Sequence, residues 1–306
     1  MRVGEYTPQA LRHLLRTEGL VLRHGPFRVR LRARSIPIAP VFHSLYADYP
    51  VASQDSLADV DIRLRRPSGI RRWWDPQAIL ESDGNVEFSP FPLDHAFPLW
   101  EWGLNWCVAM RAHQYLMLHS GVVEKHGRAV LFPAWPGSGK STLSAALAYR
   151  GWRLLSDEFG LVRPEDSALI PFPRPIPLKN QSIAVIREFA PDAVFGPTYP
   201  KTRKGDVAHV KPPASSIERA QEPAQPALIV FPNYVAGAPL DLAPMAKSRA
   251  FLKLSGNSFN YEIQGARGFK AVAQLIKACD CYSLTYSQLD DAIAVLDQRI
   301  GEHDAP

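Results

Sequence analysis

Residues 134–142 have the composition and spacing of a loop that binds phosphate groups. They match the Walker A pattern, except that an alanine replaces its first glycine. Gly137 and Gly139 allow backbone angles that turn successive N–H groups toward one point, and a helix beginning at Ser141 aims its positive end at the same point. The sequence therefore predicts a nucleoside triphosphate site made of Ala134, Trp135, Pro136, Gly137, Ser138, Gly139, Lys140, Ser141 and Thr142.

Three side chains at the end of this loop match the chemistry of a triphosphate. Lys140 is expected to neutralise the β- and γ-phosphates, and the Ser141 hydroxyl to hold a magnesium ion that bridges them. Thr142 can cap the helix or touch the α-phosphate. We expect ATP and Mg²⁺ as the cofactors, although the loop alone does not distinguish ATP from GTP.

Two carboxylates follow an apolar segment downstream of the loop. Asp157 and Glu158 come directly after residues 153–156, which we predict to be a strand. At the end of a strand beside the loop, carboxylates can hold the metal or activate the hydroxyl of a phosphoryl acceptor. A solvated acidic turn is the alternative interpretation of these two residues.

The elements around the loop have the order of an α/β nucleotide domain. Apolar runs at 115–119 and 129–133 flank a turn, which predicts a strand pair leading into the loop. Further apolar patterns predict strands at 161–163, 227–231 and 281–285, and helices at 141–149, 247–254, 269–277 and 287–300. Prolines crowd residues 171–177 and 197–213, for which we predict loops rather than central strands.

The first part of the chain has a different pattern. Residues 20–33 and 60–65 alternate apolar and charged side chains, which is typical of half-buried strands, and a short helix is predicted at 8–17. Residues 93–114 carry Trp, Leu and Met at helical spacing, and we expect Trp100, Trp102 and Trp106 in the core. We therefore predict a small, mostly antiparallel β-rich domain (1–92), a connecting helix (93–114), an α/β (α+β) nucleotide domain with a mixed sheet (115–301) and a frayed tail (302–306).

Residues 119–162 resemble the catalytic core of HPr kinase/phosphorylase. In that family a histidine precedes the loop, the loop ends in Gly-Lys-Ser, and an Arg-Gly-x-Arg-Leu-x-x-Asp-Asp run follows. The matching residues here are His119, Gly139-Lys140-Ser141 and the run from Arg150 to Glu158. Residues 172–180, 202–213 and 228–234 look like the HprK-related kinase A group of bacterial proteins.

The resemblance implies the fold shared by HPr kinases and phosphoenolpyruvate carboxykinases, and ATP-dependent phosphorylation of a hydroxyl. The acceptor would be a peptide or protein, with serine as the expected residue, or a small molecule. Glu158 stands where the family has the aspartate that takes the acceptor proton, Asp157 where its neighbour supports the metal, and His119 where the family has its active-site histidine. Because Glu is one methylene longer than Asp, the base could equally be Asp157.

One part of the family pattern is missing. The later glutamate that binds magnesium is absent, and residues 175–180 replace its segment. The glutamate that would make the second contact to the metal, and on which the phosphorylase reaction depends in the family, is therefore missing here. The family tendency is towards homo-oligomers.

Cationic side chains elsewhere in the chain could contact the transferring phosphoryl group or the acceptor, because that group needs positive charge around its oxygens. Our candidates are Lys179, Arg203, Lys204 and Arg249. Lys204 is favoured because it begins a Lys-Gly turn inside a proline-rich segment that could close over a site.

The composition excludes several classes of partner. The formal net charge of +5 comes from basic residues interleaved with acidic ones, so we expect no nucleic-acid binding. No apolar run approaches the roughly 20 residues that cross a bilayer, so we expect no membrane partner. The start of the chain lacks the pattern of a secretory signal, and Cys107, Cys279 and Cys281 are expected to be buried thiols, so we predict a cytoplasmic protein.

Three functions therefore compete. The first is a kinase that uses ATP and Mg²⁺. The second is a non-catalytic nucleotide sensor, in which ATP orders the proline-rich segments so that the N-terminal domain recruits a partner. The third is a metabolic enzyme of the phosphoenolpyruvate carboxykinase type, against which the chain is short and lacks an evident cluster of metal-binding His and Lys residues.

Overall fold

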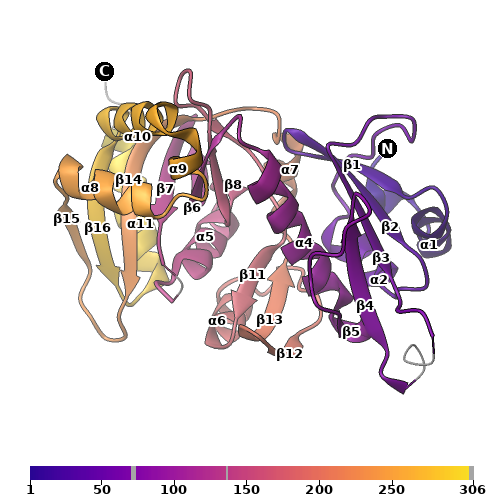
Figure 1. Ribbon diagram of the computed structural model, residues 1–306. Helices are drawn as coiled ribbons and strands as arrows, with labels where there is room; N and C mark the ends of the chain where they lie inside the picture. Colours follow the sequence, from indigo (N-terminus) through magenta and orange to yellow (C-terminus); the bar gives the residue numbers. More distant parts are fainter. Residues whose placement is uncertain (70–73, 136, 303–306) are drawn as a thin grey trace. The chain divides into compact units, whose positions relative to one another are not determined.

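The computed structural model describes residues 1–69, 74–135 and 137–302 (Figure 1). The predicted loop residue Pro136 and the predicted tail beyond residue 302 lie outside the described residues. The fold is mixed α/β, and its contacts divide the chain into two units. The first unit is Met1–Arg111 with Pro177–Asn180 and Val194–Lys211, and the second is Ala112–Ile176 with Gln181–Ala193 and Pro212–Pro306.

The first unit contains a sheet in the order β1-β2-β3-β4-β5. β2 and β3 are parallel, and the other neighbouring pairs are antiparallel. The alternation seen in the sequence matches the pleat, because Val29 and Leu31 of β2 are buried while the arginines that alternate with them are not. The strands are β1 (Leu20–His24), β2 (Phe27–Ala33), β3 (Val60–Arg65), β4 (Gln77–Ser82) and β5 (Phe91–Pro92).

Helices cover this sheet with an aromatic core. The Phe42 and Tyr46 rings stack 4.3 Å apart, and both pack edge-on against the fully buried Trp100. Trp102 and Trp106 are only half-buried, so of the three predicted core tryptophans one is fully enclosed. The helices are α1 (Pro8–Arg16), α2 (Ala39–Leu45) and α4 (Ala96–Arg111), with short 3-10 turns at Val3–Glu5 and Leu93–His95.

The prediction of loops at 171–177 and 197–213 was wrong in part, because these regions contribute a second sheet to the first unit. Its order is β11-β13-β12, from Ile176–Lys179, Gly205–Val210 and Tyr199–Thr202. The prolines sit in the edge strands or beyond the strand ends, so the central strand β13 contains none. His209 of β13 packs on Phe97 of α4, with ring centroids 5.1 Å apart. The unit boundary therefore differs from the predicted boundaries at residues 92 and 114.

The second unit contains a sheet in the order β10-β9-β6-β7-β14-β16-β15, with β8 also paired to β6. β7, β14 and β16 are parallel neighbours, whereas the outer pairs are antiparallel. The strands are β6 (Leu116–Lys125), β7 (Arg128–Pro133), β8 (Arg153–Ser156), β9 (Phe159–Val162), β10 (Leu169–Ile170), β14 (Gln225–Tyr234), β15 (Asp241–Pro244) and β16 (Asp280–Tyr286).

Helices lie on both faces of this sheet (Figure 1). Leu118 and Val122 of β6 join a core with α8 and α10, whereas Gly121, on the opposite face, packs against α5. Helix α11 packs against α5 and β16. The helices of this unit are α5 (Lys140–Tyr149), α6 (Gln181–Phe189), α7 (Ala214–Glu218), α8 (Lys247–Gly256), α9 (Tyr261–Gln264), α10 (Ala266–Ala278) and α11 (Leu289–Glu302).

Two sequence expectations concern the described residues as a whole. In the part of the chain that the structure describes, no helix combines the length and apolarity needed to cross a membrane. Cys107, Cys279 and Cys281 are buried free thiols, as predicted. Burial raises the pKa of Cys279 and Cys281, so both behave as small apolar side chains.

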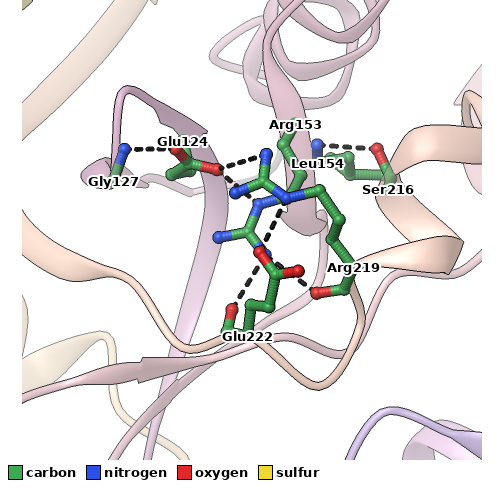
Figure 2. A network of polar contacts seen from close by, with 7 residues as sticks. All are labelled: Glu124, Gly127, Arg153, Leu154, Ser216, Arg219 and Glu222. Carbon is green, nitrogen blue, oxygen red and sulfur yellow. Dashed lines mark hydrogen bonds and ion pairs between the residues drawn. The ribbon is translucent and has the colours of Figure 1, made fainter.

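A buried ion pair joins β6 to β8 (Figure 2). The Arg153 Nε donates to Glu124, and its Nη1 donates to the main-chain oxygens of Arg219 and Glu222, each at 2.8 Å. The other Glu124 oxygen accepts the Gly127 N–H at 2.5 Å. Both charged side chains are at least 96% covered, and two of the Arg153 bonds lead to the segment after α7. The pair therefore ties the two strands to that segment.

Replacing Arg153 with leucine leaves the buried Glu124 carboxylate with the Gly127 N–H and, as its cationic partner among the described residues, the more distant Arg219 at 3.6 Å. We expect the free energy of unfolding to fall by about 3 kcal/mol, measured by urea denaturation at neutral pH. The matched control is Arg163→Ala, which removes an exposed pair with Asp166 and should change stability by less than about 1 kcal/mol. Equal losses in the two variants would contradict this account.

Candidate functional site

The glycine loop, residues 134–142, joins the carboxyl end of β7 to helix α5. Gly139 is the N-cap of α5 with φ of 87°, and Gly137 has φ of 92°, so both use the left-handed region that glycine permits. Ser141 and Thr142 lie in the first helical turn and are half-buried. The main-chain N–H groups of this turn, and the positive end of a ten-residue helix, therefore face the glycine loop.

Two tyrosines at the ends of neighbouring parallel strands support the loop from behind. Tyr286, the last residue of β16, donates from its hydroxyl to the Gly139 oxygen at 3.3 Å. Tyr234, the last residue of β14, donates its N–H to the Ser138 oxygen at 3.1 Å. Burial raises the pKa of Tyr286, so its hydroxyl stays protonated and can donate. A Cβ on Gly139 would lie 2.6 Å from that hydroxyl, so glycine is also required for space.

The loop lysine is buried and contacts the predicted acidic pair. Lys140, only 7% exposed, donates from Nζ to the main-chain oxygen of Asp157, and its Nζ lies 3.5 Å from the Asp157 Oδ1. Asp157 is itself 5% exposed. A buried ammonium needs such an anionic partner, because its desolvation is otherwise costly. The structure thus brings Lys140 and Asp157 together.

A glycine that sequence analysis missed allows this contact. Gly121 of β6 faces α5, and a Cβ there would lie 2.4 Å from the Ser144 Oγ, 3.4 Å from the Lys140 Cγ and 3.6 Å from the Asp157 Oδ1. Only a residue without a side chain lets helix α5 and the Lys140 stem approach the sheet so closely. No local signal in the sequence identifies such a glycine, because its neighbours come from two distant segments.

Glu158 lies beside His119 at the joint of β6 and β9. The Glu158 Oε2 is 3.6 Å from the His119 Nε2, and the two side chains are 19% and 23% exposed. The strand register pairs His119 with Phe159, which places the histidine next to the residue that follows Glu158. Asn257 holds the His119 backbone on the other side, accepting its N–H and donating to its oxygen, both at 2.8 Å. The structure therefore brings together Glu158 and His119, two residues that the resemblance had marked separately.

A cavity of about 490 Å³ opens beside the first half of the loop. Trp135, 67% exposed, lies at this cavity, and the ends of β14 and β16 and one side of α8 complete it. Among the described lining residues none is acidic, whereas Arg249 and Lys253 are basic. The polar groups are Ser138, Asn233, Asn257, Ser283 and Thr285. The cavity therefore suits an anionic molecule that also has a flat apolar part.

The four candidate cations are divided between the two units. Arg249 lines the cavity, as proposed for a ligand contact, although its side chain is exposed. Lys179, Arg203 and Lys204 belong to the first unit. There Arg203 lies over the Phe91 ring and Lys204 over the Trp102 ring, at 6.0 and 5.3 Å. These contacts provide the two residues with a structural role within their own unit.

Among the described residues, no three His, Cys, Asp or Glu side chains are grouped as a metal site. A magnesium ion nevertheless needs few protein ligands when phosphate oxygens and water fill its other positions. Ser141, at the start of α5, and Asp157, beside Lys140, have the oxygen donors that magnesium prefers. This donor set fits magnesium held with a phosphate ligand and does not fit an all-protein site.

Comparison with known proteins adds no assignment. A scan against protein-family models finds none that matches the chain, and a search of curated proteins finds no matching relative. The resemblance of residues 119–162 to HPr kinases therefore stays a prediction.

Gly121→Ala is expected to lower the free energy of unfolding by about 1–3 kcal/mol, because the new methyl overlaps the Ser144 Oγ. Adding Ser144→Ala removes that oxygen and should restore part of the loss, which a double-mutant cycle in urea measures. Gly256→Ala is the control, since a Cβ there meets nothing within 4 Å. Strictly additive effects of Gly121→Ala and Ser144→Ala would show that the contact is not the cause.

Proposed function

We propose that this protein is an ATP-dependent kinase that transfers the γ-phosphoryl group to a hydroxyl, with a serine of a peptide or protein as the acceptor. One observation carries the proposal. Asp157 contacts the loop lysine, while the next residue, Glu158, is paired with His119. A phosphate cradle and a group able to orient an acceptor hydroxyl are thereby held on consecutive residues.

The loop itself supports phosphate binding. It presents helix N–H groups, the end of a helix dipole and an ammonium group around one position, as a polyanion requires. The buried Ser138 Oγ has no hydrogen-bond partner among the described residues, so a ligand oxygen could satisfy it. Lys140 contacts Asp157, and a triphosphate would offer the same cation a more highly charged anionic partner.

Magnesium would be held by Ser141 and Asp157, and when bound it would neutralise charge on the β- and γ-phosphates. The chain's own residues then divide the remaining work. Asp157 is almost fully covered and engaged by Lys140, whereas Glu158 is partly exposed. Of the two carboxylates left open by the sequence, Glu158 is therefore the one that an incoming hydroxyl can reach.

The proposed reaction is an in-line displacement. The acceptor oxygen forms a bond to the γ-phosphorus, the bond from that phosphorus to the β,γ-bridging oxygen breaks, and ADP leaves. The hydroxyl proton passes to the Glu158 carboxylate. His119, whose Nε2 lies 3.6 Å from the Glu158 Oε2, orients that carboxylate.

The cavity beside the loop would receive the nucleoside. It is lined by Ala134, Trp135, Gly137 and Ser138 of the loop, and its volume of about 490 Å³ accommodates a base and a ribose. Trp135 offers a flat apolar surface for the base, and the hydroxyl and amide groups of β14 and β16 can bind the ribose. Arg249 and Lys253 add positive potential at the same cavity.

The central test compares two substitutions in purified, folded protein. Lys140→Met keeps the apolar stem but removes the charge, and should weaken Mg·ATP binding at least about tenfold in calorimetry and abolish transfer from γ-labelled ATP. Glu158→Gln should keep the affinity within about threefold while lowering transfer at least about 100-fold.

Lys270→Ala, which changes an exposed lysine on α10, is the control and should behave like the wild type. Wild-type protein that binds Mg·ATP tightly but labels no acceptor would identify a nucleotide sensor instead. Absence of Mg·ATP and Mg·GTP binding to folded wild type would falsify the whole proposal.

A second test concerns the cavity. Trp135→Ala should weaken Mg·ATP binding about tenfold but leave binding of inorganic triphosphate unchanged, because only ATP has a base to stack. Lys140→Met should weaken both ligands alike. If Trp135→Ala affects the two ligands equally, the nucleoside does not occupy this cavity.

A further inference from the structure

Residues 257–260, which connect α8 to α9, are fixed along the start of β6 by a dense set of hydrogen bonds. Asn257 brackets the His119 backbone with two bonds of 2.8 Å. The Phe259 N–H donates to the Met117 oxygen at 2.8 Å, and the Met117 N–H donates to the Asn260 Oδ1 at 2.9 Å. This segment is therefore a rigid platform rather than a loose connection.

The platform holds a large apolar side chain beside the proposed base. The Phe259 ring lies 5.7 Å from the His119 ring and 4.7 Å from the Phe159 ring, measured between centroids. Phe159 is buried, at 2% exposure, but Phe259 remains 43% exposed. An exposed aromatic ring leaves apolar surface in contact with water. Binding of an apolar group would remove that surface from water and thereby gain free energy.

The same segment contacts both halves of the site. Asn257 lines the cavity beside the glycine loop, while Phe259, two residues later, packs on the histidine that pairs with Glu158. An acceptor whose hydroxyl reaches Glu158 must therefore place its neighbouring groups near the Phe259 ring. Polar uncharged groups gain little from the ring, because a phenyl group offers no hydrogen-bond donor or acceptor. A cationic group could stack on the ring but would be repelled by Arg249 and Lys253 at the adjacent cavity, so apolar groups are favoured.

We infer that Phe259 is a specificity-determining contact for the phosphoryl acceptor, and that the acceptor is a polypeptide whose reacting serine is flanked by an apolar side chain. This inference rests on the proposed kinase function. It adds the kind of side chain required beside the reacting serine and names the residue that selects it. A free amino acid would leave the ring exposed.

The test uses a peptide library with a central serine and varied flanking residues, incubated with the full chain, Mg²⁺ and γ-labelled ATP. We expect the wild type to label peptides with Leu, Ile or Phe beside the serine about tenfold faster than peptides with Asp, Lys or Gly there. Phe259→Ala should reduce this preference to less than about threefold, and Phe259→Leu should retain most of it. Binding of Mg·ATP, measured by calorimetry, should stay within about twofold in both variants.

Phe269→Ala is the matched control, because Phe269 is an exposed phenylalanine of the same unit, on α10. It should keep the wild-type preference. An unchanged preference in Phe259→Ala, wild-type labelling that ignores the flanking residue, or labelling of free serine or glucose but of no peptide would each overturn the inference. Failure of the kinase proposal itself is seen separately, as loss of Mg·ATP binding or of all transfer in the wild type.

Discussion

The contact between Lys140 and Asp157 is the constraint on which the site depends. A buried ammonium is tolerated only with an anionic partner, so the end of β8 must meet the start of α5. That meeting requires the helix to approach β6 closely, which Gly121 permits, and requires the glycine loop to turn sharply, which Gly137 and Gly139 permit. Because Glu158 is the next residue after Asp157, the same contact also fixes the backbone position of Glu158. One electrostatic requirement thus positions the groups that the proposed phosphoryl transfer uses.

The parallel strands β7, β14 and β16 provide the rigid edge for this arrangement. All three end at the same edge of the sheet, where ligands of α/β proteins commonly bind. β7 leads into the glycine loop, and the final residues of the other two, Tyr234 and Tyr286, hold its backbone. By contrast, Arg153 pairs with Glu124 in a buried network that joins β6 and β8 (Figure 2). The role of Arg153 is therefore structural.

Local sequence signals predicted the parts of the site that are contiguous in the chain. The glycine loop, its flanking strand and helix, and the acidic pair after β8 all follow from residue spacing. Gly121, Tyr234, Tyr286 and Phe259 could not be found in this way, because each owes its role to residues more than ten positions away. The proline-rich region misled the prediction for another reason. The density of prolines in residues 197–213 predicted a loop. None of these prolines lies within β13, so its N–H groups remain available for hydrogen bonds in the sheet.

The division of the chain has a consequence for its synthesis. The first unit is completed by Val194–Lys211, which emerges only after β6 to β10 and α5 of the second unit. Proteins are made vectorially, at about 5–20 residues per second, and an N-terminal domain usually folds before the next one appears. Here that order is not available, because β13 must reach Phe97 across more than a hundred intervening residues. The face of α4 that carries Phe97 therefore stays without this packing until the ribosome has passed the glycine loop.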